Sequence, residues 1–88
     1  MRDYYLVRGG RLRREENTLY VESKDGEKKA IPVNDVQAIY ALGELDLNSK
    51  LLVFLAQHGI VLHIFNYYGY YSGTYYPRER LLSGFLLV

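Results

Sequence analysis

The chain has no cysteine among its 88 residues, which excludes two common ways of stabilising a small domain. Neither disulfide bonds nor a cysteine-ligated zinc ion can supplement a thin hydrophobic core. A single domain of about this length buries only somewhat more than about 60% of the surface that its unfolded chain exposes. We therefore expect one small domain that depends on the packing of its core.

Long hydrophobic runs are also missing. The longest one in the middle of the chain, residues 51–56, is far too short to cross a bilayer. The first five residues, MRDYY, do not begin a signal peptide, because no long apolar segment follows a charged start. These features predict a cytoplasmic protein without a membrane partner.

Net charge is small, +1 at pH 7, which argues against a wholly basic nucleic-acid-binding domain. The positive charges are clustered, however: Arg8, Arg11, Arg13 and Arg14 fall within seven residues. In a strand, residues 11 and 13 share one face, so their guanidinium groups could contact successive DNA phosphates. The alternative is a charged edge strand that discourages aggregation, and the sequence favours neither.

The first third of the chain is typical of short strands joined by turns. Residues 4–7 and 11–14 flank Gly9-Gly10, which predicts a hairpin between them. Residues 18–22 alternate apolar and polar side chains, as in a half-buried strand. An Asp-Gly turn at 25–26 then predicts an antiparallel return by residues 29–33. Because Pro32 cannot donate a backbone hydrogen bond, it marks an edge or a strand end.

The rest of the chain predicts two more strands and one helix. Residues 36–42 alternate, with Val36 expected on the same face as Ala38 and Tyr40. From 48 to 58 the apolar spacing becomes helical, with Asn48 or Ser49 as N-cap and Gly59 just past the C-terminus. Residues 60–65 predict a central strand that is buried on both faces. The predicted fold is mainly β, or α+β by count of one helix: a small two-sheet sandwich-like domain with a single covering helix at about 48–58.

Tyrosine is abundant, and six of the ten tyrosines lie in residues 66–77, NYYGYYSGTYYP. Tyrosine favours strands and glycine permits reversals, so this segment predicts a closing hairpin of the sheet. Tyrosine rings pack through an apolar body and keep a polar hydroxyl, which suits a subunit interface. The interface candidates are Tyr67, Tyr68, Tyr70, Tyr71, Tyr75 and Tyr76. The alternative is a platform that stacks on sugars or on single-stranded bases.

No catalytic or metal-binding pattern is present. The two histidines, His58 and His63, have no zinc-protease spacing, and they are better explained as a helix-end residue and a strand residue. Ser72 and Ser83 lack a base partner and the nucleophile-elbow motif. Gly9-Gly10 is not followed by a helix, as a phosphate-binding loop would be. We predict no catalytic residue, no metal ligand and no cofactor in this chain.

Several segments together resemble the N-terminal β-domain of the CRISPR-associated integrase, the endonuclease subunit that inserts new spacers during adaptation. They are GGRLRREENTLYVES at 9–23, KKAIPVNDVQAIYALGELDLN at 28–48, LLVFLAQHGIVLHIFN at 51–66, GYYSGTYYPRE at 69–79 and SGFLLV at 83–88. The resemblance covers essentially all 88 residues, and it rests on the order and spacing of these segments.

The resemblance implies that residues 1–88 form an N-terminal β-domain of a longer protein. A helical catalytic domain with a divalent metal site, magnesium or manganese, would lie outside this chain. The apolar end at 81–88 also suggests a cut chain or a subunit contact. Implied partners are a second copy in a homodimer, a small companion subunit of the adaptation complex, and double-stranded DNA. Some members wedge the DNA end with an aromatic residue near the first turn, but Arg8-Gly9-Gly10 has none.

Three functional hypotheses follow. The favoured one is a non-catalytic dimerisation and DNA-positioning domain of a metal-dependent spacer integrase that acts in antiviral defence. A second is a carbohydrate- or peptide-binding β-module that uses the tyrosines as a platform. A third is an independent enzyme that uses His58 and His63.

Overall fold

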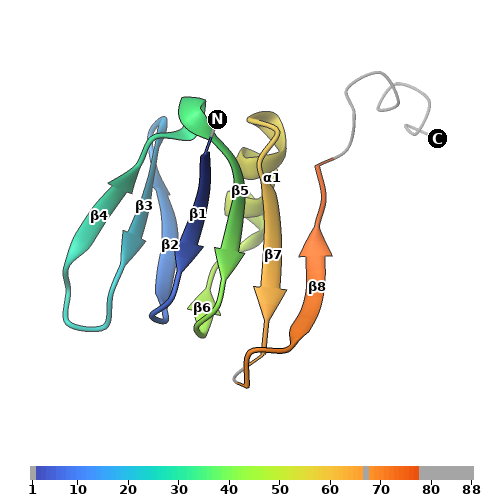
Figure 1. Ribbon diagram of the computed structural model, residues 1–88. Coiled ribbons are helices and arrows are strands. Elements are labelled where there is room, and N and C mark those ends of the chain that lie inside the picture. Colours follow the sequence, from blue (N-terminus) through green and yellow to red (C-terminus); the bar gives the residue numbers. More distant parts are fainter. Residues whose placement is uncertain (1, 67, 78–88) are drawn as a thin grey trace.

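The computed structural model describes residues 2–66 and 68–77 (Figure 1). Within these residues the chain forms strands, one α-helix and one short 3-10 helix. The helices are η1 (Val33–Asp35) and α1 (Ser49–Gln57). The strands are β1 (Arg2–Leu6), β2 (Gly10–Glu15), β3 (Thr18–Glu22), β4 (Lys28–Ile31), β5 (Val36–Ala41), β6 (Leu45–Asp46), β7 (Val61–Phe65) and β8 (Tyr71–Tyr75).

The strands form two mixed sheets. The first has the order β1-β5-β7-β8, in which β1, β5 and β7 run parallel and β8 is antiparallel to β7. The second has the order β4-β3-β2-β6, in which β2, β3 and β4 are antiparallel and β6 runs parallel to β2. Figure 1 shows α1 behind β5 and β7 of the first sheet. The prediction of a mainly β domain with a single covering helix is confirmed.

The hydrophobic core combines residues from both sheets and the helix. Leu12, Leu19 and Ile31 come from the second sheet, Ile39 and Leu62 come from the first, and all five are almost fully buried. The helix adds Leu51, Phe54 and Leu55. One continuous core therefore joins all three parts, as expected for a domain too small to divide its apolar surface.

The helix forms where the apolar spacing and the capping residues predict it. Asn48 is the N-cap, and its side-chain oxygen accepts a hydrogen bond of 3.0 Å from the backbone N–H of Leu51. Gly59 follows the C-terminal end with φ of 68°, a conformation that glycine adopts without strain. Val53 is 55% exposed, so the helix does not bury all of its apolar residues.

The predicted hairpin between residues 4–7 and 11–14 is wrong. Strand β1 pairs in parallel with β5, whereas β2 pairs with β3 and β6 in the other sheet. The Gly9-Gly10 pair thus carries the chain from one sheet to the other. A Cβ atom at Gly9 would lie 2.4 Å from the backbone oxygen of Glu44, so glycine is required there by close approach of two loops.

The turns on either side of β3 are tight hairpins. Glu15 faces Thr18 across the β2–β3 turn, where Glu16 has a left-handed φ of 56°. The predicted Asp25-Gly26 turn and antiparallel return are confirmed, since Val21 of β3 faces Lys29 of β4. Strand β4 is an edge that ends just before Pro32, as predicted.

Two details of the first sheet differ from the sequence pattern. Gln37 has no partner in the β1–β5 register, and this irregularity places Val36 in the core with Ile39 and Ala41 instead of with Tyr40. Strand β7 is an inner strand, as predicted, but it is not buried on both faces: Leu62 is fully buried, whereas Val61, His63 and Phe65, which alternate with it on the opposite face, are only partly buried. The helix and the second sheet cover only one face of this sheet.

An ion pair joins β2 to β4 on the surface of the second sheet. Lys28 Nζ donates to Glu15 Oε1 at 2.6 Å, and this hydrogen bond, with the nearby charges of Lys28 and Arg13, lowers the pKa of the Glu15 carboxyl. Because the pKa is lowered in the folded state, the pair stabilises the fold at any pH above the ordinary pKa of the carboxyl. This stabilisation is lost as the pH falls through the lowered pKa. We expect Glu15→Gln to lower the thermal midpoint slightly at pH 7, by a deficit that shrinks as the pH is lowered through the lowered pKa of the carboxyl, with Glu27→Gln as control. A deficit that does not shrink on acidification would contradict this assignment.

Candidate functional site

A basic groove lies between β2 and the N-terminal end of α1. Its walls include Arg11, Arg13, Arg14 and Lys50, with Asp46 as the acidic residue among its lining. Leu12 and Leu51 form part of its floor, and both are buried. The groove collects cations that are far apart in sequence, because α1 packs against β2 through the core. Its net positive charge suits an anionic ligand.

The arginines of the groove are not equivalent. Arg13 forms an ion pair with Glu22 across the β2–β3 ladder, at 3.5 Å. The guanidinium carbon of Arg14 lies 4.8 Å from the ring centroid of Phe54, and its Nε donates to the Glu16 carbonyl at 2.6 Å. Arg11 is exposed and has no ion pair among the residues that the structure describes. Arg11 and Lys50 are thus the cations best placed to bind an external anion.

The fourth arginine candidate, Arg8, lies apart from the groove lining. It is exposed in the link between β1 and β2. The pKa of the Asp25 carboxyl is lowered mainly by the hydrogen bond from Ser23 Oγ and, as a smaller cause, by the charge of Arg8. Arg8 is therefore near the β3–β4 turn, at a separate part of the surface.

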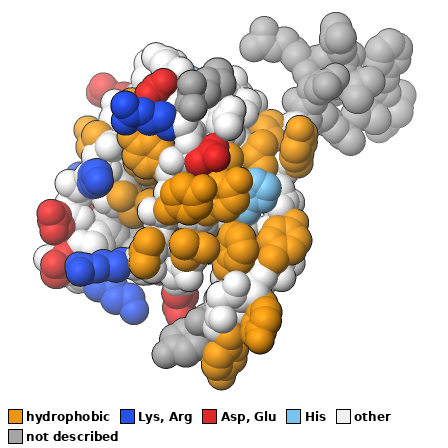
Figure 2. All heavy atoms as spheres, in the orientation of Figure 1, with side chains coloured by type: hydrophobic (Ala, Val, Ile, Leu, Met, Phe, Trp, Pro, Cys, Tyr) orange, Lys and Arg blue, Asp and Glu red, His pale blue; other side chains and the backbone are white. Residues whose placement is uncertain are grey.

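An aromatic row crosses the exposed face of the first sheet. It consists of Tyr5, Tyr40 and His63, which face one another across β1, β5 and β7. Tyr40 stacks on Tyr5 at a centroid distance of 4.8 Å and on His63 at 4.6 Å, with interplanar angles of 12° and 21°. Figure 2 shows hydrophobic side chains gathered on this face. Because Tyr40 is held between two rings, neither of its faces is free to stack on a sugar or a base.

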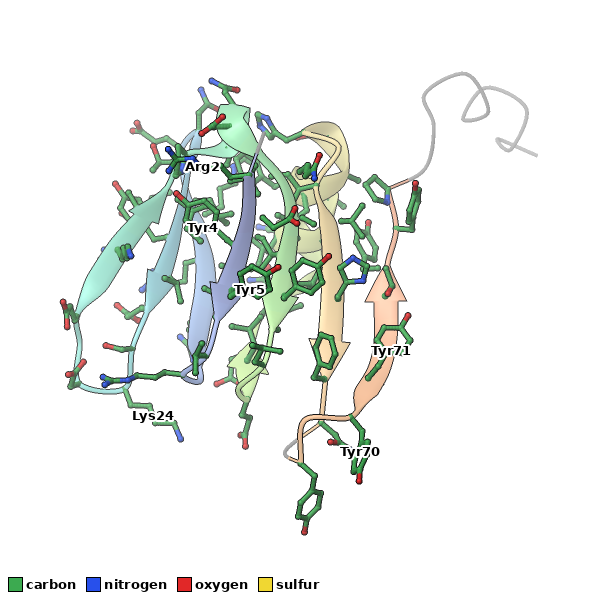
Figure 3. The ribbon with its side chains drawn as sticks, viewed as in Figure 1. Arg2, Tyr4, Tyr5, Lys24, Tyr70 and Tyr71 are labelled. Atoms are coloured by element: carbon green, nitrogen blue, oxygen red, sulfur yellow. The ribbon has the colours of Figure 1, made fainter. Side chains whose placement is uncertain are left out.

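Strand β8 extends the aromatic row. His63 Nδ1 is hydrogen-bonded to Thr74 Oγ1 at 2.9 Å, and the Tyr71 hydroxyl is 2.5 Å from the same oxygen. Tyr71 also meets Phe65 edge to face at 5.8 Å. In Figure 3, Tyr5 on β1 and Tyr71 on β8 mark opposite sides of the row. The face is flat, apolar and rimmed with hydroxyl groups.

The predicted tyrosine interface residues are mostly on the surface. Tyr68, Tyr70, Tyr71 and Tyr76 are all at least 60% exposed. Tyr75 differs, because it is partly buried and packs against the core. Tyr67 lies outside the described residues, as do residues 78–88. The segment forms the β7–β8 hairpin that the sequence predicts.

The histidines occupy separate environments. His58 is the C-cap of α1, and its ring centroid lies 4.5 Å from that of Phe54. His63 belongs to the aromatic row. Among the described residues, no group of three histidine, aspartate or glutamate side chains is arranged to hold a metal ion. No helix in the described part of the chain is long and apolar enough to cross a membrane.

Comparison with known proteins identifies the family. The model of the CRISPR associated protein Cas1 family matches residues 4–88. The chain belongs to the Cas1 family. It is 53% identical over 88 residues to a CRISPR-associated endonuclease Cas1 of Thermodesulfovibrio yellowstonii, and 58% identical over 88 residues to one of Moorella thermoacetica. Both matches cover 100% of this chain and 27% of the relative, so the chain spans about a quarter of the length of these Cas1 proteins.

Solved Cas1 structures share the fold. A Cas1 protein from Thermotoga maritima superposes with a TM-score of 0.85 at 49% identity, over 96% of this chain and 27% of that one. A Cas1–DNA complex gives 0.72 at 14% identity, over 86% of this chain and 29% of that one. A casposase bound to an integration product superposes with a TM-score of 0.70 at 17% identity, over 90% of this chain and 26% of that one. The last two show only that the fold is shared.

Two groups of surface residues were missed by the sequence reasoning. Lys50 joins the arginines only because α1 packs beside β2, and nothing in the local sequence indicates that contact. Tyr5, Tyr40 and His63 are brought together by parallel pairing between distant strands. The alternation of side chains along a strand shows which residues of that strand share a face. It could not show which strands are neighbours.

Proposed function

We propose that residues 1–88 form the non-catalytic dimerisation and DNA-positioning domain of a Cas1 spacer integrase. The basic groove is the observation that carries the DNA-binding part of this proposal. It gathers Arg11, Arg14 and Lys50 on one surface, and DNA backbone contacts are made chiefly by such cations. A related fold has been solved as a Cas1–DNA complex, which supports DNA as the anion.

Catalysis belongs, on this proposal, to a helical domain outside these 88 residues, which would bind magnesium or manganese. One observation supports this division: the relatives are named CRISPR-associated endonucleases, and this chain spans 27% of their length. A cytoplasmic location, a homodimer and a small companion subunit of the adaptation complex belong to the same proposal.

The geometry of the aromatic row leaves Tyr40 no ring face on which a sugar could stack. A sugar stacks on the exposed face of an aromatic ring, and the Tyr40 ring is covered by Tyr5 and His63 on its two sides. The row exposes ring edges and hydroxyl groups, a surface typical of protein interfaces. This arrangement supports the dimerisation part of the proposal.

Salt dependence of DNA binding tests the groove. Binding of the chain to a fluorescent DNA duplex is measured by anisotropy between about 50 and 200 mM salt. Each phosphate contact adds about 0.9 to the magnitude of the slope of log K against log salt concentration. The double variant Arg11→Gln with Lys50→Gln should therefore show a slope that is smaller in magnitude by about 1.8. Affinity should fall for all duplex sequences alike, since phosphate contacts carry no base information.

The matched control removes the same charge elsewhere. Arg2 pairs with Asp35 at the surface and Lys29 lies on the edge strand β4, both outside the groove lining. Arg2→Gln with Lys29→Gln should leave the slope nearly unchanged. An equal loss in both double variants would show that only total charge matters. DNA binding that is insensitive to salt would argue against phosphate contacts by the groove, and an affinity that survives raised salt and follows sugar instead of phosphate would favour the carbohydrate or peptide alternative.

A further inference from the structure

A carboxylate lies within the basic groove. Asp46 is the last residue of the short strand β6, and it lines the groove together with Arg11 and Lys50. Asp46 and Arg11 also line a second, smaller hollow beside the groove, which Lys24 borders. An acidic residue in this place repels the same anion that the neighbouring cations attract. Asp46 therefore lowers the attraction of the groove for a polyanion.

Strand pairing places Asp46 directly beside Arg11. In the parallel β2–β6 pair, Arg11 is the partner of Asp46. Adjacent strands lie about 4.8 Å apart, and successive side chains of a strand point to opposite faces of the sheet. The neighbouring residues Leu12 and Leu45 pack in or against the hydrophobic core, so Arg11 and Asp46 point away from it. Both are exposed, and their charged groups share one surface.

The other acidic neighbour of Arg11 already has a partner. Across the β2–β3 pair Arg11 faces Glu22, so a row of three charged residues runs through Glu22, Arg11 and Asp46. The Glu22 carboxylate forms an ion pair with Arg13, at 3.5 Å. In the described part of the chain, neither Arg11 nor Asp46 forms an ion pair. Asp46 is therefore the acid whose charge acts on Arg11, the residue of β2 best placed to bind phosphate.

We infer that Asp46 restrains DNA binding by competing with a DNA phosphate for the Arg11 guanidinium. The inference rests on the proposed DNA-binding function of the groove and names a residue that regulates it. In the free domain, the negative charge of Asp46 offsets the field of Arg11. A phosphate that binds Arg11 must come close to the carboxylate, and this repulsion cancels part of the Coulomb energy that the contact gains. Asp46 acts through Arg11 and does not itself bind the DNA.

Restraint of this kind suits a domain that must not be held by bulk DNA. Phosphate contacts carry no base information, so a groove of unopposed cations would bind any duplex. Genomic DNA supplies a very large excess of such competing sites. With Asp46 beside Arg11, the groove binds a duplex weakly by itself. It contributes fully only when contacts elsewhere in the longer protein hold the DNA against it.

Removing the charge of Asp46 without changing its shape tests the inference. Binding of Asp46→Asn to the fluorescent duplex is measured by anisotropy between about 50 and 200 mM salt. At the lowest salt the affinity should rise by about threefold to tenfold, because exposed charges are only partly screened there. The slope of log K against log salt concentration should grow in magnitude by up to about 0.9, since Arg11 then contributes as a full phosphate contact. Asp46→Glu keeps the charge and should bind like the unchanged chain.

Glu27→Gln is the matched control for Asp46→Asn. Glu27 is exposed in the β3–β4 turn and lines neither the groove nor the smaller hollow. The same change in net charge at this distance is largely screened, so affinity should stay within about twofold. An equal gain from both variants would overturn the inference, because net charge alone would then explain it. The absence of any gain from Asp46→Asn would overturn it as well.

A double-mutant cycle shows whether Asp46 acts through Arg11. In Arg11→Gln no guanidinium remains for which Asp46 and the phosphate could compete. The gain from Asp46→Asn in this background should therefore fall to about twofold or less, as expected for two residues that are coupled. A gain that persists in full would overturn the inference and make Asp46 an independent repulsive charge. Equal thermal midpoints of the variants show that the affinities do not reflect loss of the fold.

The groove and its restraint can fail separately. If Arg11→Gln with Lys50→Gln lowers the salt slope but Asp46→Asn changes nothing, the groove binds DNA and Asp46 does not restrain it. If none of these substitutions changes binding, the proposed DNA-binding function of the groove and the role of Asp46 are overturned together.

Discussion

Replacing Phe54 by alanine is expected to lower the free energy of unfolding by about 3 to 5 kcal/mol. The Phe54 side chain is only 1% exposed and lies where the helix meets both sheets. Its ring also contacts Arg14 and His58. Small domains have a total stability of only about 5 to 15 kcal/mol, so this loss would remove a large part of it.

Urea unfolding followed by circular dichroism measures the effect of Phe54→Ala. The control is Val53→Ala, which removes an adjacent side chain that is 55% exposed and should change stability by less than about 0.5 kcal/mol. Phe54→Leu separates packing from the ring contacts. It keeps most of the buried volume but loses the cation–π contact with Arg14, so its cost should be intermediate. A loss from Val53→Ala equal to that from Phe54→Ala would show that α1 does not pack as described.

Replacing Gly43 by alanine is expected to cost about 1 to 3 kcal/mol, or to prevent folding, because of a backbone collision. A Cβ atom at this position would lie 2.5 Å from the amide nitrogen of Gly9 and 2.7 Å from the carbonyl carbon of Arg8. These are main-chain atoms, which cannot rotate away as the end of a side chain can. The collision occurs where the β1–β2 link crosses from the first sheet to the second.

Gly73→Ala provides the control for Gly43→Ala. Both substitutions add one methyl group, but no atom lies within 4 Å of a Cβ at Gly73. Removing glycine flexibility from the unfolded chain should then leave the protein equally stable or slightly more stable. Thermal unfolding of the two variants measures the difference. Equal midpoints would mean that the two loops do not approach each other closely.

Local signals account for the parts of the fold that sequence reasoning predicted. The helix has its apolar spacing, its Asn48 cap and its terminal Gly59 within a dozen residues. The β3–β4 hairpin is specified by the Asp25-Gly26 turn, and the β7–β8 hairpin by the turn after Asn66. In each case, the interacting residues are near one another in the chain, so their pattern is readable in sequence.

Distant pairing explains where the sequence reasoning failed. Residues 4–7 and 11–14 surround a glycine pair, a pattern typical of a hairpin, yet β1 pairs with β5 more than thirty residues along the chain. Parallel pairing of this kind has no turn signal, because the strands are joined by a long crossover. The same limit applies to the candidate site, where Lys50 meets Arg11 only through packing of α1 beside β2.

The amino-acid sequence by itself determined the class of the domain, its helix, its local hairpins and its membership in the Cas1 family, which the comparison then confirmed. It also contains the arginine cluster of residues 8–14. Only the tertiary structure decided which strands are neighbours, which cations share a groove and which rings form the row of Tyr5, Tyr40 and His63. The physical reason is that these contacts depend on burial of one shared core, whose free energy depends on the whole chain and not on any local segment.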